Sequence, residues 1–236
     1  MARDYAAMSR PMHLTPDHVA RTFRAVPDPD DALLMGWHRL DEAEIAAAAR
    51  ELLAARPAGP LHVFAYGSLL WKPEFEPLAS RRGHVDGWHR SFCIELTTWR
   101  GTPEAPGLMM ALLPGGRCTG LVQEVPEAAV VPVTEALIAR ETPFRELLEA
   151  RRWLDVQTAE GHLRALTFYA PPVGEELRTD LTAEATARMI ARACGHAGSN
   201  AEYLHETLKA LGAHGIRDGR LWRLQKLVAA ELDRMG

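Results

Sequence analysis

The order in which strand and helix patterns follow one another is the feature that most constrains this fold. Segments with strand patterns lie together between residues 61 and 169, with one helical pattern among them, and the other helical patterns lie at the two ends. Strands and helices therefore do not alternate, and no GxGxxG segment follows a strand, so we do not expect a doubly wound parallel sheet. The order predicts a single α+β domain, a mixed, curled sheet or small barrel with helices packed outside it and at both termini.

Two kinds of apolar spacing predict the strands. Residues 88–99 alternate, with Phe92, Ile94 and Leu96 on one face, which is typical of a half-buried strand. Residues 108–113 are apolar throughout, which suits a strand covered on both faces. Further strands are expected in the apolar run that begins at His62 and at 118–125, 152–158 and 163–169, with turns at Pro114-Gly115-Gly116 and Ala159-Glu160-Gly161. The strands 88–99 to 118–125 would then form a meander.

Capping residues and helix breakers mark the expected helices. Asp41 can cap an alanine-rich helix over 42–56, which Pro57 ends because it disfavours helical backbone at the residue before it. The other expected helices are a short one within 16–25, one from Pro132 to Arg140 or Glu141, one over 182–194, one over 199–212 that starts with the capping box Ser199-Asn200-Ala201-Glu202, and one after Asp218. We expect residues 1–60 to form an arm and a helix that pack on a domain of residues 61–236.

Charge and hydropathy exclude several classes of partner. The formal net charge is -4 and the isoelectric point is near 6.2, so the sequence lacks the basic character typical of nucleic-acid-binding domains. No segment approaches the roughly 20 apolar residues of a membrane span, and residues 1–13 lack the continuous apolar segment of a signal peptide. We therefore expect a cytoplasmic protein that binds a small molecule or a protein, and neither nucleic acid nor a membrane.

The cysteines and histidines are not spaced as metal or redox sites. Cys93, Cys118 and Cys194 form no CxxC pair, and the 10 histidines form neither HxxxH nor HxH. We expect reduced thiols in the core and no metal or other cofactor, with ligands gathered from distant positions as the alternative. A nucleophilic pair of Cys93 and His89 is set aside, because residues four apart on a strand are ~13 Å apart.

The segment HVFAYGSLLW, residues 62–71, leads an apolar run into a turn at Tyr66-Gly67-Ser68. Glycine at position 67 allows a positive φ or a close approach of the backbone to a ligand. If the amides of Ser68 and Leu69 point into a concavity, they form a small anion-binding nest that suits a carboxylate. The alternative is a plain turn between strands, with Tyr66 and Trp71 in the core.

Five segments together resemble the ChaC-like γ-glutamylcyclotransferases, over approximately residues 61–211. The segments are FAYGSLLW from Phe64, GWHRSFCIELT from Gly87, RGTPEAPGLMMAL from Arg100, GGRCTGLVQEVPEAA from Gly115 and GSNAEYL from Gly198. The resemblance implies the fold of that family, with residues 61–236 as the catalytic domain. It also implies the conversion of glutathione, or another γ-glutamyl compound, into 5-oxoproline with release of the remaining amine, which is Cys-Gly for glutathione.

In such a reaction the α-amine of the substrate attacks the γ-carbonyl of the same molecule. Holding the substrate in the correctly folded conformation therefore removes much of the activation barrier. The amine is largely ammonium at neutral pH, and a positioned carboxylate must take a proton and return one to the leaving nitrogen. The resemblance implies that this carboxylate is Glu141, in the segment ALIARET. A helix C-terminus would raise its pKa and Arg140 would lower it. The alternative reading of Glu141 is a solvated helix end.

The resemblance also implies a set of substrate-binding residues. They are Phe64, Ala65, Tyr66, Gly67, Ser68, Leu69, Arg100 and Tyr203. Arg100 could pair with a substrate carboxylate through its planar guanidinium, or lie on the surface as many arginines do. Tyr203 could reach the pocket, or pack on an apolar helix face.

Two positions depart from the family pattern. Ala65 stands where the family has Gly, and residues 142–153, TPFRELLEARRW, contain neither the Gly nor the Tyr that many members have after the glutamate. The leaving-group side could therefore differ, which keeps two alternatives: a cyclotransferase for other γ-glutamyl amines or amino acids, and a non-catalytic module that binds a small carboxylate. Glu141 separates them, because a binder of an anionic ligand gains nothing from a carboxylate beside the nest.

Overall fold

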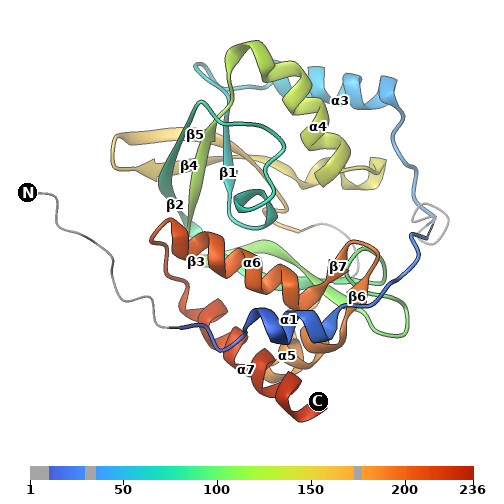
Figure 1. The fold of residues 1–236 in the computed structure, drawn as a ribbon. Coiled ribbons are helices and arrows are strands. Elements are labelled where there is room, and N and C mark those ends of the chain that lie inside the picture. The colour runs from blue at the N-terminus through green and yellow to red at the C-terminus, as the bar shows by residue number, and fades with distance from the viewer. Residues whose placement is uncertain (1–10, 30–35, 173–176) are drawn as a thin grey trace, which may run out of the picture.

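The structure, a computed structural model, describes residues 11–29, 36–172 and 177–236, and its central feature is a closed barrel (Figure 1). The strands in chain order are β1 (His62–Ala65), β2 (Ala79–Leu96), β3 (Gly107–Glu124), β4 (Arg151–Thr158) and β5 (Gly161–Phe168). Their order around the barrel is β1-β3-β2-β4-β5. β1 closes the barrel because it pairs antiparallel with β3 and parallel with β5. The predicted α+β fold with a small mixed barrel is confirmed.

The shortest strand of the barrel, β1, leads directly into the turn singled out in the sequence. All residues of β1 are buried, as expected of an apolar strand with a neighbour on each side. A short 3₁₀ helix, η1 (Ser68–Leu70), follows at once. The predicted hairpin is also confirmed: β4 and β5 pair throughout, up to Thr158 opposite Gly161.

The predicted meander is wrong at the turn expected at Pro114-Gly115-Gly116, because residues 107–124 form one long strand. Gly115 and Gly116 have φ angles of 98° and 80°, and Gly87 on the facing strand has a φ angle of 80°. The register of β2 against β3 shifts beside Gly87. These glycines therefore form a bulge that bends a continuous pair of strands and does not reverse the chain.

β2 also differs from its prediction in two ways, and both come from its long pairing with β3. β2 begins at Ala79 and not at Trp88, because the polar residues before the first bulge still pair with β3. A second register shift between Phe92 and Ile94 leaves Phe92, Cys93 and Ile94 all buried. The strict alternation predicted for this strand is therefore interrupted.

The helices form two groups, drawn above and below β1 in Figure 1. The upper group contains α3 (Glu42–Ala54) and α4 (Val130–Glu141), and the lower group contains α1 (Pro16–Thr22), α5 (Ala183–Arg192), α6 (Asn200–Ala213) and α7 (Gly219–Met235). The predicted caps Asp41, Ser199 and Asp218 accept hydrogen bonds from first-turn amides. α5 ends earlier than predicted, because residues 194–195 form a short strand, β6 (Cys194–Gly195), with β7 (Gly198–Ser199).

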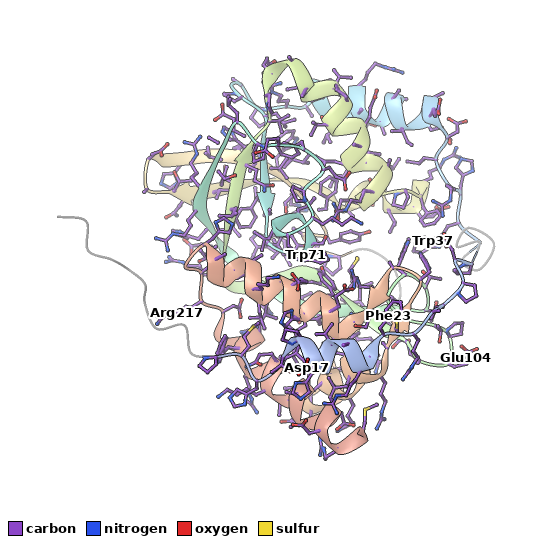
Figure 2. All side chains as sticks on the ribbon, viewed as in Figure 1. Asp17, Phe23, Trp37, Trp71, Glu104 and Arg217 are labelled. Atoms are coloured by element: carbon purple, nitrogen blue, oxygen red, sulfur yellow. The ribbon has the colours of Figure 1, made fainter. Side chains whose placement is uncertain are left out.

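Helix α6 packs against both the barrel and η1. In Figure 2, Trp71 lies between η1 and α6, and its Nε1 donates to Thr207 Oγ1 of α6 at 3.1 Å. This contact fixes the end of the turn that follows β1. In the part of the chain that the structure describes, no helix is both long and apolar enough to cross a membrane.

The N-terminal segment contacts both groups of helices. The amide of Leu14 donates to Gln225 Oε1 of α7 at 2.8 Å. The amide of Leu40 donates to the carbonyl of Pro143, just after α4, at 2.9 Å. Residues 1–10 and 30–35 of the predicted arm lie outside the described residues, and its separation from a domain of residues 61–236 stays a prediction.

Candidate active site

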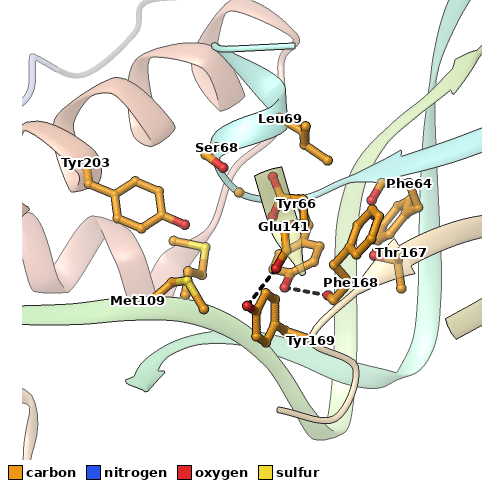
Figure 3. A pocket seen from close by; sticks show the side chains of 12 residues that line it. Phe64, Tyr66, Ser68, Leu69, Met109, Glu141, Thr167, Phe168, Tyr169 and Tyr203 are labelled. Carbon is orange, nitrogen blue, oxygen red and sulfur yellow. Dashed lines mark hydrogen bonds between the residues drawn. The ribbon is translucent and has the colours of Figure 1, made fainter. Parts of the chain in front are cut away.

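A small pocket lies where β1, η1, β3, the end of α4 and α6 meet (Figure 3). The predicted site residues that line it are Phe64, Tyr66, Gly67, Ser68, Leu69, Glu141 and Tyr203. Its other lining residues, which the sequence did not single out, are Met109, Met110, Thr167, Phe168 and Tyr169. The fold thus brings the turn after β1 and the last residue of α4 to one place, although they are far apart in the sequence.

The Glu141 carboxyl is largely removed from water. Its side chain is 14% exposed, and its Oε1 lies 3.2 Å from Nε of Arg140 but has no hydrogen-bond partner among the described residues. Burial raises the pKa of Glu141, while the Arg140 guanidinium lowers it and the Glu74 carboxylate raises it further. The alternative of a solvated helix end is therefore wrong, and burial is the largest cause of the raised pKa.

Arg140 connects the end of α4 to the turn after β1. Its Nη2 donates to Ser68 Oγ at 3.1 Å, and its Nη1 donates to the Glu74 carboxylate at 2.5 Å and to the carbonyl of Lys72. The sequence indicated Arg140 only as a charge beside Glu141. Its contact with Ser68 has no sequence signal, because only the tertiary fold brings the two residues together.

The turn itself uses glycine for close approach and not for a positive φ. Gly67 has a φ angle of -130°, and a Cβ at this position would lie 3.2 Å from the Tyr203 hydroxyl oxygen. The amides of Ser68 and Leu69 belong to the first turn of η1, where backbone donors have no intrahelical acceptor. Both residues line the pocket. The anion-binding role of these amides stays a prediction.

Tyrosine side chains converge on the pocket (Figure 3). The Tyr66 hydroxyl donates to the carbonyl of Phe168 at 2.9 Å, and the Tyr169 hydroxyl donates to the backbone carbonyl of Glu141 at 2.8 Å. Burial, with a contribution from the Glu141 charge, raises the pKa of Tyr66, Tyr169 and Tyr203. All three phenols therefore stay neutral near pH 7 and can act as hydrogen-bond donors.

Tyr169 supplies a tyrosine beside Glu141 although the segment after Glu141 lacks the one that many family members have there. Residues 142–153 contain no tyrosine, but the residue that follows β5 places a tyrosine hydroxyl against Glu141. In the sequence, Tyr169 is predicted only as the last residue of the strand 163–169. Nothing in the local pattern indicated its contact with α4.

Ala65 and Arg100 do not line the pocket. Ala65 is fully buried within β1. Arg100 Nη1 donates to the carbonyl of Ser199 at 2.8 Å and to the Glu202 carboxylate at 2.9 Å, and its guanidinium lies 5.3 Å from the centroid of the Tyr203 ring. The structure therefore gives Arg100 protein partners and places it against the Tyr203 ring. It also corrects the predicted capping box, since the Glu202 side chain pairs with Arg100.

The cysteines take no part in the pocket. Cys93, Cys118 and Cys194 are free and buried, as the sequence predicted. Burial raises the pKa of the Cys93 thiol to about 11, so the thiolate that nucleophilic catalysis needs is scarce at neutral pH.

Comparisons with known proteins identify similar proteins over the part of the chain that contains the pocket residues. The family model described as ChaC-like protein matches residues 61–231. A glutathione-specific γ-glutamylcyclotransferase of Escherichia coli (strain K12) is 38% identical over 178 residues, which cover 75% of this chain and 76% of the relative. Glutathione-specific γ-glutamylcyclotransferase 1 of Danio rerio is 31% identical over 147 residues, which cover 61% of this chain and 75% of the relative.

A solved structure has a similar fold. It is a γ-glutamyl cyclotransferase specific to glutathione from yeast, with a TM-score of 0.64 and 22% sequence identity, and the match covers 72% of this chain and 96% of the yeast chain. At this identity the likeness shows the fold alone. The match of the family model over most of the chain and the identity to the Escherichia coli enzyme establish the family. This chain belongs to the ChaC-like protein family.

Proposed function

We propose that this chain is a γ-glutamylcyclotransferase that cleaves glutathione into 5-oxoproline and Cys-Gly. Membership of the ChaC-like family and the names of its relatives support the reaction. One observation of this chain carries the proposal: a buried carboxylate, Glu141, shares a pocket with the turn formed by residues 66–69. The turn offers the first amides of η1, those of Ser68 and Leu69, for an anion, and the carboxylate offers a base.

The substrate's α-carboxylate accepts hydrogen bonds from the amides of Ser68 and Leu69, which leaves its α-amine facing Glu141. The amine nitrogen then attacks the γ-carbonyl carbon, the ring C–N bond forms, and the peptide C–N bond to cysteine breaks. The substrate ammonium loses two protons as it becomes the ring amide, and the leaving nitrogen gains two as it becomes an ammonium. Glu141 carries protons from one nitrogen to the other, so no external base is consumed.

The environment of Glu141 suits this role. A carboxyl with a raised pKa is a stronger base when ionised, and once protonated it keeps its proton nearer to neutral pH until the leaving nitrogen takes it. The neutral hydroxyl of Tyr203 lines the same pocket and can donate a hydrogen bond to the substrate, while Tyr169 donates its proton to the Glu141 carbonyl and can only accept a further bond. Because the attack is intramolecular, the main task of the pocket is to orient the substrate.

Measuring 5-oxoproline release from glutathione, γ-glutamyl amino acids and γ-glutamylamines tests the proposal. We expect the purified protein to turn over glutathione, and Glu141→Gln to fold but to lose activity by a factor on the order of 10² or more, as loss of a general base does. Glu135→Gln on the same helix, outside the pocket, is the matched control. Full turnover by Glu141→Gln would contradict the mechanism, turnover of other substrates only would contradict the specificity, and binding without turnover would favour the non-catalytic module.

A further inference from the structure

Arg140 makes contacts that the stability of α4 does not require. Its guanidinium reaches Glu141 through Nε at 3.2 Å, Ser68 Oγ through Nη2 at 3.1 Å and Glu74 through Nη1 at 2.5 Å. The side chain is 21% exposed and adds a bond to the carbonyl of Lys72. One planar group therefore touches the carboxylate of the proposed site and three residues in or after its turn.

We propose that Arg140 is a positioning residue, which holds the turn of residues 68–72 against the Glu141 carboxylate and, together with Glu74, sets the charge around that carboxylate. The inference rests on the proposed function, because it assigns Arg140 a part in the same reaction. A guanidinium suits this position, since its donors point in fixed directions within one plane, whereas a lysine ammonium is a single point charge. Ser68 is the residue whose amide we assign to the substrate carboxylate, so the bond to its Oγ orients the binding turn.

The charges around Glu141 have opposite effects on its pKa. Arg140 on the same helix lowers the pKa, and Glu74 raises it. Besides Arg140 and Glu74, the titratable groups that the structure records against Glu141 are the neutral phenols of Tyr66, Tyr169 and Tyr203. Removing the positive charge of Arg140 should therefore raise the pKa of Glu141, and removing the negative charge of Glu74 should lower it. A purely structural role would not produce shifts of opposite sign.

The first test is the pH dependence of kcat/KM for 5-oxoproline release. The fall of kcat/KM at low pH, the acidic limb of this profile, reports the pKa of the base in the free enzyme. We expect the limb to move to higher pH in Arg140→Met and to lower pH in Glu74→Gln. In Ser68→Ala the charge stays, so the limb should not move, while KM should rise about fivefold, as the loss of one ordinary hydrogen bond gives. Arg164→Met is the matched control, because Arg164 is 51% exposed and pairs with Asp155 on the outside of the barrel.

Arg140→Lys separates the two parts of the proposal. It keeps the positive charge but not the planar set of donors, so its acidic limb should stay near that of the wild type while its KM rises as in Ser68→Ala. The electrostatic part would be overturned if the acidic limb of the pH profile did not move in Arg140→Met or in Glu74→Gln. It would also be overturned if the limb moved in the same direction in both variants. An unchanged KM in both Ser68→Ala and Arg140→Lys would overturn the positioning part.

A second measurement does not depend on turnover. The Glu141 carboxyl can be titrated by ¹³C NMR in glutamate-labelled protein, with Glu141→Gln to assign its resonance. We expect its midpoint to rise in Arg140→Met and to fall in Glu74→Gln, and an unchanged midpoint in both would overturn the inference. If the wild type turns over no γ-glutamyl compound, the proposed function fails, and this titration still decides whether Arg140 and Glu74 control the carboxyl.

Discussion

Glu141 shows how a residue placed for chemistry can oppose stability. Its Oε1 is buried without a hydrogen-bond partner among the described residues, and Arg140 is the nearest compensating charge that the structure records for it. Keeping such a carboxylate ionised in the folded protein costs free energy, which appears as a raised pKa. The same raised pKa suits the base that we propose Glu141 to be.

Replacing Glu141 by Gln should therefore stabilise the protein at neutral pH. An unfolded glutamate titrates near 4.5, and the folded carboxyl titrates above that value, so the folded state retains the proton more strongly. The contribution of Glu141 to the stability of the wild type is accordingly greatest below about pH 4.5 and is lost as the pH rises through the folded pKa. The gain in the free energy of unfolding for Glu141→Gln, measured by urea unfolding, should be larger at pH 7 than at pH 4. A gain that is equal at both values, or larger at pH 4, would contradict this reading.

At the level of single residues, the sequence predicts the site where its motifs are contiguous and fails where side chains meet through the fold. The turn from Tyr66 to Leu69 and the proposed base Glu141 are carried by short segments of sequence, and all of these residues line the pocket. The contacts of Arg140 with Ser68 and of Tyr169 with Glu141 join distant segments. No spacing rule within one segment could predict them.

The start of α7 is joined to the pocket by a buried arginine of β2. Arg90 is 2% exposed, and its Nη1 donates to the carbonyl of Tyr66 at 3.0 Å. Its Nε lies 3.2 Å from Oδ2 of Asp218. Asp218 also caps α7, accepting from the amides of Arg220 and Leu221. One carboxylate therefore serves both the helix and the guanidinium that supports the turn.

Two substitutions of Asp218 should separate these contributions. Asp218→Ala removes the cap and leaves the Arg90 guanidinium without its carboxylate, so we expect a loss of about 3 kcal/mol in the free energy of unfolding. Asp218→Asn keeps a good capping oxygen and removes only the charge, and it should be less destabilising by about 1 kcal/mol. Urea unfolding curves of both variants test this. Equal losses would mean that the cap contributes nothing, and losses under about 0.5 kcal/mol in both would mean that the ion pair is unimportant.

Element boundaries were predictable where capping chemistry decides them and not where sheet pairing does. Asp41 and Asp218 begin their helices as predicted, because a side-chain oxygen close in sequence satisfies the first amides. Pro114-Gly115-Gly116 has the composition of a reversing turn, yet the facing Gly87 accommodates it as a bulge. Whether a pair of glycines turns or bends a strand depends on the partner strand, which local sequence does not specify.

Over the whole molecule, the N-terminal segment lies outside the family match, which begins at residue 61, yet it packs on the segment that follows Glu141. The amide of Arg145 donates to the carbonyl of His38 at 2.9 Å, and Arg39 and Phe144 form an isolated antiparallel bridge. The Trp37 ring meets the Phe144 ring edge to face, with centroids 5.6 Å apart. Part of the segment that departs from the family pattern thus packs on residues that lie outside the family match.

This contact should stabilise the end of α4 and, through it, the position of the Glu141 carboxylate. Trp37→Ala removes the ring that packs on Phe144, which is fully buried, so we expect a loss of about 1 to 2 kcal/mol in the free energy of unfolding and a lower kcat/KM for 5-oxoproline release. Phe23→Ala is the matched control in the same N-terminal segment, because Phe23 is 69% exposed and its removal should change stability by less than about 0.5 kcal/mol. Equal stability and equal activity of the two variants would show that residues 37–40 only rest on the domain. A lower kcat/KM in Trp37→Ala alone, at a temperature where both variants are fully folded, would show that the arm supports the site.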